Sequence, residues 1–95
     1  LVINPDGLAN QTEGGIIQTV SWALKEAVQY DRNRILTQNW VDYPILTFEE
    51  VPQVEVTVVN RPELPSLGAG EGAQGPTASA IAPSRVPNPP QARML

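Results

Sequence analysis

Apolar side chains recur at helical spacing in the first third of the chain. They lie three or four residues apart on one face, whereas Gln18, Ser21 and Lys25 point elsewhere. This period predicts one long amphipathic helix that continues to about Tyr30. The apolar positions are Ile16, Val20, Leu24, Ala27 and Val28, flanked by Ile17 and Ala23.

The start of this helix is predicted near residue 11. Asn10 is followed three residues later by Glu13, a spacing typical of a capping box. Before it, residues 1–3 read as a short strand that ends in a turn at residues 4–7. The pair Gly14-Gly15 would lie in the first helical turn, where each glycine costs about 1 kcal/mol of helix propensity. We therefore expect another group to approach that backbone closely.

The middle of the chain alternates with a period of two. Val54, Val56 and Val58 share one face while polar side chains separate them, a pattern typical of a half-buried strand. Residues 35–37 and 40–43 also read as extended pieces, after a polar break that follows the helix. The predicted fold class is α+β, with one long amphipathic helix packed on a small antiparallel sheet.

Prolines dominate the C-terminal end. A helix that starts at Pro76 would be cut short by Pro83, and residues 83–95 are predicted to form a disordered Pro-rich tail. The tail has a PxxP spacing beside Arg85, which suits a polyproline-binding groove. Such spacings also arise by chance in any Pro-rich segment.

Composition excludes several function classes. The 95 residues are enough for one small domain or a piece of a larger one. With no Cys and no His, disulfides, thiolate nucleophiles, Ser-His triads and ordinary zinc sites are excluded, and no metal ligand is predicted. A net charge of -4 argues against nucleic acid as a partner. The longest weakly charged stretch, residues 14–24, is too short to span a membrane.

The Gly-rich loop at residues 68–75 is the first candidate site. Glycines let backbone N–H groups approach an anion, but the P-loop lysine is missing and Ala73 stands where a dinucleotide-binding pattern needs its third glycine. Glu71 is the stronger candidate, because a carboxylate between Gly70 and Gly72 is uncrowded, as a general base requires. The alternative is an ordinary surface turn that contains one acid.

The predicted helix start is the second candidate. Unpaired N–H groups at a helix N-terminus attract an anion or a polar ligand, and Gln11 can donate and accept hydrogen bonds there. The alternative is an ordinary capped helix whose glycine pair packs against a neighbouring strand.

Several short motifs occur in a recognisable order. The run from Ile3 to Gly15 has the form N-P-x(n)-Q-x-E-G-G, residues 42–44 read D-Y-P, residues 51–56 read V-P-Q-V-E-V, and residues 68–77 read G-A-G-E-G-A-Q-G-P-T. Together they resemble the molybdenum-binding large subunit of the xanthine oxidase and aldehyde oxidase family. The last motif is most similar to the isoquinoline 1-oxidoreductase β-subunit type of that family.

The resemblance implies an oxidoreductase that hydroxylates an N-heteroaromatic or aldehyde substrate with water as the oxygen source. It implies that Glu71 is the general base and that Gln11 and Gly70 belong to the cofactor site. The cofactor would be molybdenum–molybdopterin, shared with domains outside these residues. Electrons would leave through a separate iron–sulfur small subunit or domain.

The resemblance also implies that residues 1–82 are part of a molybdopterin-binding domain in a larger subunit, whose remainder is a partner. From Pro83 the sequence departs from the family pattern, and a frameshift or truncation there is one hypothesis. This piece alone is expected to be inactive, and the bacterial cytoplasm and the periplasm both stay open. The competing function is a non-enzymatic acidic interaction module whose Pro-rich tail binds a partner and in which Glu71 has no special role.

Overall fold

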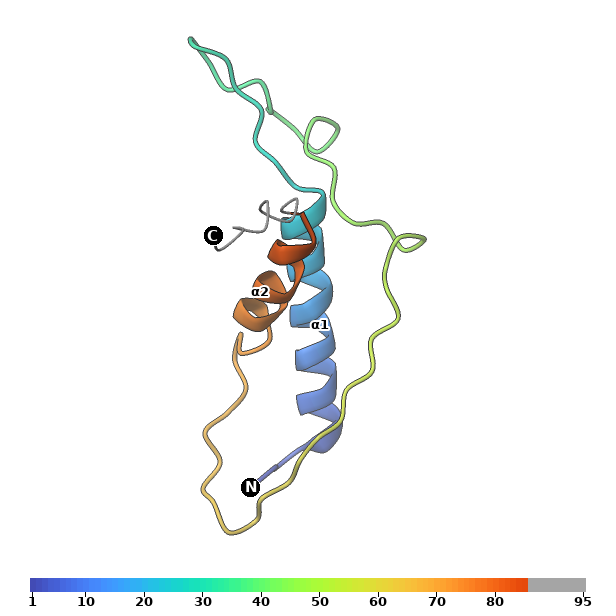
Figure 1. Ribbon diagram of the computed structural model, residues 1–95, viewed down its shortest axis with the longest axis vertical. Coiled ribbons are helices and arrows are strands. Elements are labelled where there is room, and N and C mark those ends of the chain that lie inside the picture. The colour runs from blue at the N-terminus through green and yellow to red at the C-terminus, as the bar shows by residue number, and fades with distance from the viewer. Residues whose placement is uncertain (86–95) are drawn as a thin grey trace, which may run out of the picture.

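The computed structural model describes residues 1–85 and contains two α-helices, α1 (Pro5–Leu24) and α2 (Gln74–Arg85). Figure 1 shows the two helices side by side, with the chain between them forming a long irregular excursion. Across the described range no β-strand forms, and the nearest approach to one is a single antiparallel bridge between Tyr30 and Ile35. The predicted α+β fold with a small antiparallel sheet is therefore wrong.

Helix α1 begins earlier than the sequence pattern indicated. Asn4 is the N-cap, and its side-chain Oδ1 accepts a hydrogen bond of 2.8 Å from the Gly7 N–H. Pro5 occupies the first helical turn, where its missing N–H costs nothing, and Asp6 complements the positive end of the helix dipole. The Asn-Pro-Asp-Gly sequence suits a helix start as well as a turn. The predicted capping box at Asn10 is wrong, because that residue lies inside the helix.

Helix α1 also ends earlier, at Leu24 and not near Tyr30. The Ser21 carbonyl accepts hydrogen bonds from the N–H groups of both Lys25 and Glu26, at 2.9 and 3.0 Å. The Ser21 hydroxyl in turn donates to the Glu26 carboxylate, so the chain is diverted away from the helix axis at this point. Side-chain contacts thus override the apolar period that continues through the following residues.

The polar break after the helix is a tight turn. One Asp31 carboxylate oxygen accepts hydrogen bonds from the Asn33 and Arg34 N–H groups, at 2.7 and 2.9 Å. On either side of the turn, the Leu36 N–H donates to the Gln29 carbonyl at 2.8 Å. The segment folds back on itself without continuing into a ladder.

A second turn replaces the extended piece predicted at residues 40–43. The Asn39 side chain accepts a hydrogen bond of 2.8 Å from the Val41 N–H, and the Asn39 carbonyl accepts one of 3.2 Å from Asp42. Asn favours such turns because its side chain bonds to its own backbone two residues on. The rings of Trp40 and Tyr43 meet edge to face, with centroids 6.4 Å apart.

Residues 51–60 run extended along the outside of the structure (Figure 1). The predicted alternation is present: Val54, Val56 and Val58 are half-buried, while Glu55 and Thr57 between them are exposed. No described segment pairs with this one through its backbone. The side-chain period predicted the extended conformation, and the missing partner is why no strand results.

Helix α2 is longer than the prolines predicted. It runs for 12 residues and includes Pro83, so the expected early stop is wrong. Pro76 lies in its first turn, where proline is tolerated. The rest of the predicted Pro-rich tail, residues 86–95 with its PxxP spacing, lies outside the described residues.

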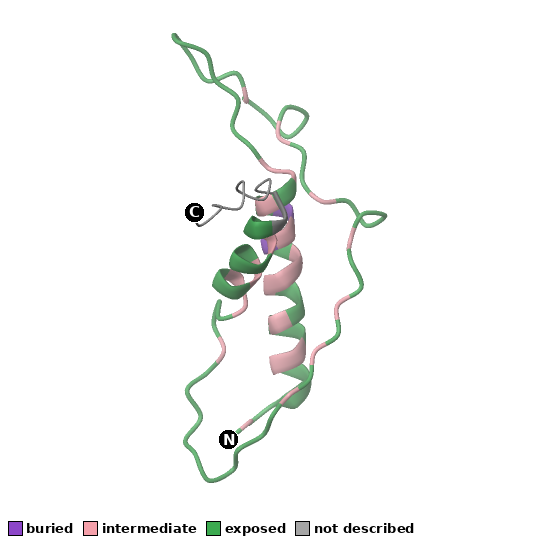
Figure 2. Cartoon of the chain, in the orientation of Figure 1, coloured by how far each residue is buried: buried purple, intermediate pink, exposed green. Residues whose placement is uncertain are grey.

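The described part of the chain buries few side chains (Figure 2). Thr19 and Ser21 on α1 are 2% and 5% exposed, and no apolar side chain in residues 1–85 is fully buried. On the predicted apolar face of α1, Ile16 and Val20 are half-buried, whereas Leu24 is 47% exposed. No helix within these residues has the length and apolar character needed to cross a membrane.

Candidate functional site

A hydrogen bond joins two of the residues singled out from the sequence. The Gln11 side-chain Nε2 donates to the Gly70 carbonyl oxygen at 2.8 Å, across 59 residues of sequence. Gln11 lies in the second turn of α1 and not at its start, because the helix begins at Pro5. The interpretation that Gln11 borders free N–H groups of a helix N-terminus is therefore wrong. Its side chain instead meets the Gly-rich loop.

The conformation of this loop depends on its glycines. Gly68 and Gly70 have φ angles of +79° and +51°, a region that residues with a Cβ rarely adopt. The loop then tightens into α2, with the Gly72 N–H donating to the Ala69 carbonyl at 3.1 Å. Glu71 lies in the turn between these glycines and α2, next to the Gly70 carbonyl that Gln11 of α1 holds.

Close packing of α1 against α2 fixes the base of the loop. A Cβ placed on Gly15 would lie 3.3 Å from the Cβ of Ala73, whereas nothing lies within 4 Å of one placed on Gly14. Gln74 at the start of α2 donates to the Gln18 side chain at 3.3 Å. The close approach expected at the glycine pair is thus made at Gly15, by Ala73 directly before α2, and the backbone at Gly14 is open.

The junction of helix and loop is concave. A pocket of about 290 Å³ lies between α1 and the loop, and small or polar residues line most of it. The residues that line it are Leu8, Gln11, Thr12, Gly15, Ala69, Gly70, Gly72 and Ala73. Glu71 is exposed beside this pocket, and its carboxylate makes no hydrogen bond or ion pair with the described residues. A free carboxylate next to a small pocket can accept a proton from a bound molecule.

Residues that line the pocket, and Glu71 beside it, carry hydrogen-bonding groups without partners. Neither the Gly70 N–H nor the Glu71 N–H donates a hydrogen bond within residues 1–85, and the Gln11 Oε1 accepts none there. Two free donors and one free acceptor suit a large polar ligand with both kinds of group. No Lys or Arg lines the pocket, so any phosphate on that ligand would need cations from elsewhere. In the described part no cluster of His, Cys, Asp or Glu could hold a metal ion.

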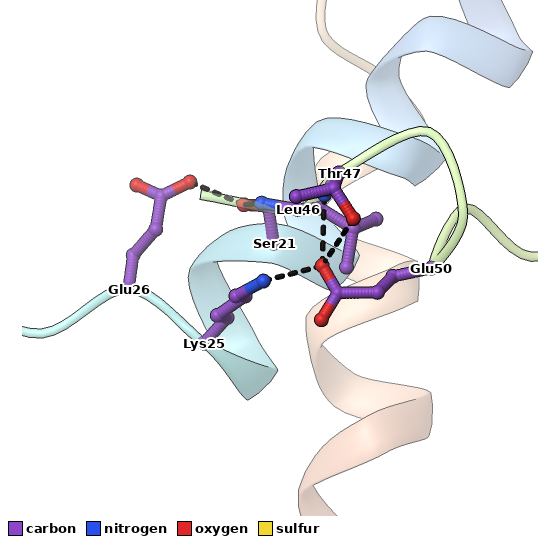
Figure 3. Close-up of polar contacts among 6 residues, drawn as sticks. All are labelled: Ser21, Lys25, Glu26, Leu46, Thr47 and Glu50. Atoms are coloured by element: carbon purple, nitrogen blue, oxygen red, sulfur yellow. Dashed lines mark hydrogen bonds and ion pairs between the residues drawn. The ribbon is translucent and has the colours of Figure 1, made fainter. Parts of the chain in front are cut away.

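A second polar cluster, not foreseen from the sequence, joins the end of α1 to residues 43–50. The Glu26 carboxylate accepts a hydrogen bond from the Ser21 hydroxyl, whose oxygen accepts one of 3.0 Å from the Leu46 N–H (Figure 3). The Glu26 carboxylate also accepts a hydrogen bond of 2.8 Å from the Tyr43 hydroxyl. The bond to Glu26 raises the pKa of Tyr43 above its usual 10.0. Because these residues are up to 25 positions apart, no local motif connects them.

The same cluster holds Glu50 by an ion pair with Lys25 (Figure 3). The Lys25 ammonium, with the N–H and hydroxyl of Thr47, lowers the pKa of the Glu50 carboxyl from 4.5 to about 2. Both side chains are partly exposed, so salt screens the attraction. This cluster lies at the opposite end of α1 from the pocket, and we assign it to holding the chain in place.

The first part of the chain matches a known domain family. Residues 1–52 match a family model described as a molybdopterin cofactor-binding domain. This match covers more than half of the 95 residues. The chain therefore belongs to the molybdopterin cofactor-binding domain family.

Characterised relatives agree with this assignment. The chain is 40% identical over 82 residues to a subunit of nicotinate dehydrogenase from Pseudomonas putida, which covers 86% of this chain and 7% of that protein. It is 44% identical over 59 residues to the β-subunit of isoquinoline 1-oxidoreductase from Brevundimonas diminuta, covering 62% of this chain and 8% of the relative. It is 30% identical over 91 residues to the nicotine 6-hydroxylase large subunit of Paenarthrobacter nicotinovorans, and the match covers 93% of this chain and 11% of that protein. No solved structure matches.

These comparisons confirm the resemblance to molybdenum-binding large subunits and molybdenum–molybdopterin as the cofactor. The chain spans only about a tenth of the length of these relatives. The roles of Glu71, Gln11 and Gly70 stay predictions, as does the boundary at residue 82.

Proposed function

We propose that this chain forms one wall of the active site in a molybdenum hydroxylase large subunit, with Glu71 as the general base. The observation that carries the proposal is the hydrogen bond from Gln11 to the Gly70 carbonyl. It fixes the residue before Glu71 against α1, so that an exposed carboxylate lies beside a pocket with free hydrogen-bonding groups.

Each residue has a task in this proposal. The Gln11 Oε1 and the N–H groups of Gly70 and Glu71 bind polar edges of molybdopterin, and they hold it against the loop. When bound, the molybdenum cofactor supplies the two-electron redox chemistry of hydroxylation. The Glu71 carboxylate accepts the proton that the water-derived nucleophile loses as it attacks an electron-poor carbon. The absence of basic residues at the pocket is consistent with a carboxylate that stays available as a base.

The substrate class in this proposal is an N-heteroaromatic compound or an aldehyde. The names of the relatives refer to nicotinate, isoquinoline and nicotine, which favours the N-heteroaromatic compound. All three relatives are named as one subunit of their enzyme, which supports a partner polypeptide. We assign to that partner, an iron–sulfur small subunit, the removal of electrons.

The test is to replace Glu71 by Gln in the complete enzyme and to measure turnover of nicotinate, isoquinoline, nicotine and an aldehyde. Gln keeps the size and polarity of the side chain but cannot accept the proton. We expect kcat/KM to fall by about 10²–10⁴-fold, the usual contribution of a general base. Molybdenum content should be unchanged, because the backbone groups of the loop remain.

Glu63→Gln is the matched control, since Glu63 is also exposed and its side chain makes no hydrogen bond with the described residues. It removes the same charge away from the pocket and should leave kcat/KM near that of the unaltered enzyme. If Glu71→Gln retains full turnover with molybdenum bound, Glu71 is not the base. If both variants lose activity equally, the loss reflects net charge and the assignment also fails.

A further inference from the structure

A second pocket lies at the other end of α1 from the Gly-rich loop, where the helix meets residues 40–46. Its volume is about 390 Å³, within the range of pockets that hold small molecules. Aromatic and aliphatic side chains form most of its wall, and one of the side chains that line it is an acid. We call it the aromatic pocket, and the residues that give it its chemistry are Gln18, Ser21, Trp22, Glu26, Trp40 and Tyr43.

Three aromatic rings line this pocket without being buried in a core. Trp22 on α1 is 45% exposed, and Trp40 is 78% exposed. The rings of Trp40 and Tyr43 meet edge to face, with an angle of 71° between their planes. Two rings at so steep an angle form a corner, and the electron-rich face of an aromatic ring attracts a cation. Groups of rings of this kind form the aromatic cages that bind methylated ammonium ions.

The Glu26 carboxylate at this pocket is held by hydroxyl groups and not by a cation. One of its oxygens accepts a hydrogen bond from Ser21 (Figure 3), and the other accepts one from Tyr43. No ion pair within residues 1–85 includes Glu26, and the ammonium of its neighbour Lys25 is bound to another acid. The two hydroxyl groups fix the position of the carboxylate but leave its negative charge uncompensated. The pocket therefore favours a cation.

The other polar groups of the aromatic pocket already have partners within the chain. The buried Ser21 hydroxyl donates to Glu26 and accepts from the Leu46 N–H. The Gln18 Oε1 accepts a hydrogen bond of 3.3 Å from Gln74. A primary ammonium or a guanidinium group, with its several N–H donors, would find few free acceptors here. A cation without N–H groups has no such donors to satisfy, so it suits a wall of rings and aliphatic side chains.

We propose that the aromatic pocket binds a quaternary ammonium ion or an N-alkylated heteroaromatic cation, held against the rings of Trp40 and Tyr43 and paired with the Glu26 carboxylate. Trp22 lines the side of the pocket that α1 forms. The raised pKa of Tyr43 keeps its hydroxyl protonated at neutral pH, so that it continues to donate to Glu26. This is a second binding site, and it does not depend on the role of Glu71.

Choline and its uncharged analogue 3,3-dimethylbutan-1-ol test the proposal, because the two molecules have the same shape and differ in charge. Their methyl signals are followed by NMR as each is titrated with the complete large subunit. We expect choline to bind at least about fivefold more tightly, since ring faces and a carboxylate attract only the cation. Equal affinity for the two molecules, or no binding of choline, would overturn the proposal. This comparison uses the unaltered subunit and needs no variant to fold.

Two pairs of variants locate the bound choline. Glu26→Gln removes the charge and should weaken binding at least about tenfold, whereas Glu49→Gln removes an exposed acid outside the pocket and should not. Trp40→Leu should weaken binding about 2–5-fold, the contribution of one exposed ring. Phe48→Leu is its control, because it removes an exposed ring that does not line the pocket. Unchanged affinity in both pocket variants, or equal losses in the variants and their controls, would contradict the proposal.

Glu71→Gln separates this site from the catalytic assignment. It should lower turnover and leave the affinity for choline unchanged. Loss of choline binding in Glu71→Gln would place the cation at the Gly-rich loop and would overturn the proposal. Full turnover in Glu71→Gln, with choline binding intact, would refute the catalytic assignment and support the second site.

Discussion

The glycine pair in α1 allows the packing of the two helices to be measured with two single-methyl changes. Gly14→Ala places a Cβ in open space, with nothing within 4 Å. Gly15→Ala places one 3.3 Å from the Cβ of Ala73, tighter than ordinary van der Waals contact. Both changes make the same improvement in helix propensity, about 1 kcal/mol in favour of Ala.

The two variants should therefore differ by the packing cost alone. Gly14→Ala should stabilise α1 by about 1 kcal/mol. In Gly15→Ala that gain is offset by overpacking, which costs about 1–3 kcal/mol in a tight contact. The net effect ranges from neutral to about 2 kcal/mol destabilising, and it should displace the start of α2 by a few tenths of an ångström. Because α2 begins directly after the Glu71 loop, that displacement reaches the pocket.

Far-UV circular dichroism of the 95-residue chain against temperature is the assay. Helix content should rise in Gly14→Ala and should stay level or fall in Gly15→Ala. Equal gains in the two variants would refute the packing of α1 on α2 at this point. Loss of bound molybdenum from the complete enzyme in Gly14→Ala alone would show that the open side of α1 faces the cofactor.

Two further changes probe the ends of α1. Asn4→Ala removes the N-cap hydrogen bond to Gly7 and should cost about 1 kcal/mol of helix stability, seen as reduced helix content. Asn10→Ala should not reduce helix content, because Asn10 lies inside the helix, where Ala is the better helix former. Equal losses in the two variants would contradict the observed helix start. The Glu50 carboxyl should titrate at about 2 in an NMR pH titration, and Lys25→Gln should return its pKa toward 4.5. Since folding lowers the pKa of Glu50, the stabilisation that its charged form gives the fold is fully present above pH 4.5 and disappears as the pH falls through about 2. Titration of Glu50 near 4.5 in the unaltered chain would contradict the ion pair.

The sequence predicted the existence of a long helix and the residues that meet near its first turns. Gln11 and the Gly-Glu-Gly loop were both singled out, and the structure brings them together through Gly70. Left-handed glycines and a conspicuous acid leave local signals in sequence, which is why the loop was recognisable. The family motifs added the molybdenum–molybdopterin cofactor and the predicted roles of Glu71 and Gln11, which composition alone does not indicate.

The failed predictions share a physical cause. The ends of α1 depend on Asn4, whose cap is also a good turn signal, and on Ser21, whose partners lie up to 25 residues away. The predicted sheet failed because period two describes one face of a segment and not whether another segment pairs with it. Residues 53–59 satisfy the pattern and find no partner among the described residues. Long-range contacts of this kind have no local signature.

Helix α1, with 20 residues, is about 30 Å long, and the extended segment from Glu50 to Asn60 spans about 33 Å. This match in length restricts how the segment can vary among relatives. Substitutions between Glu50 and Asn60 leave two contacts within reach, the ion pair of Glu50 with Lys25 and the hydrogen bond of the Asn60 side chain with the Val2 N–H. Deleting one residue shortens the segment by about 3.3 Å and breaks one of these two contacts. Inserting one residue makes the segment bend outward. Relatives that keep both contacts should therefore differ between Glu50 and Asn60 by substitution and rarely by insertion or deletion, unless α1 changes length by a compensating amount.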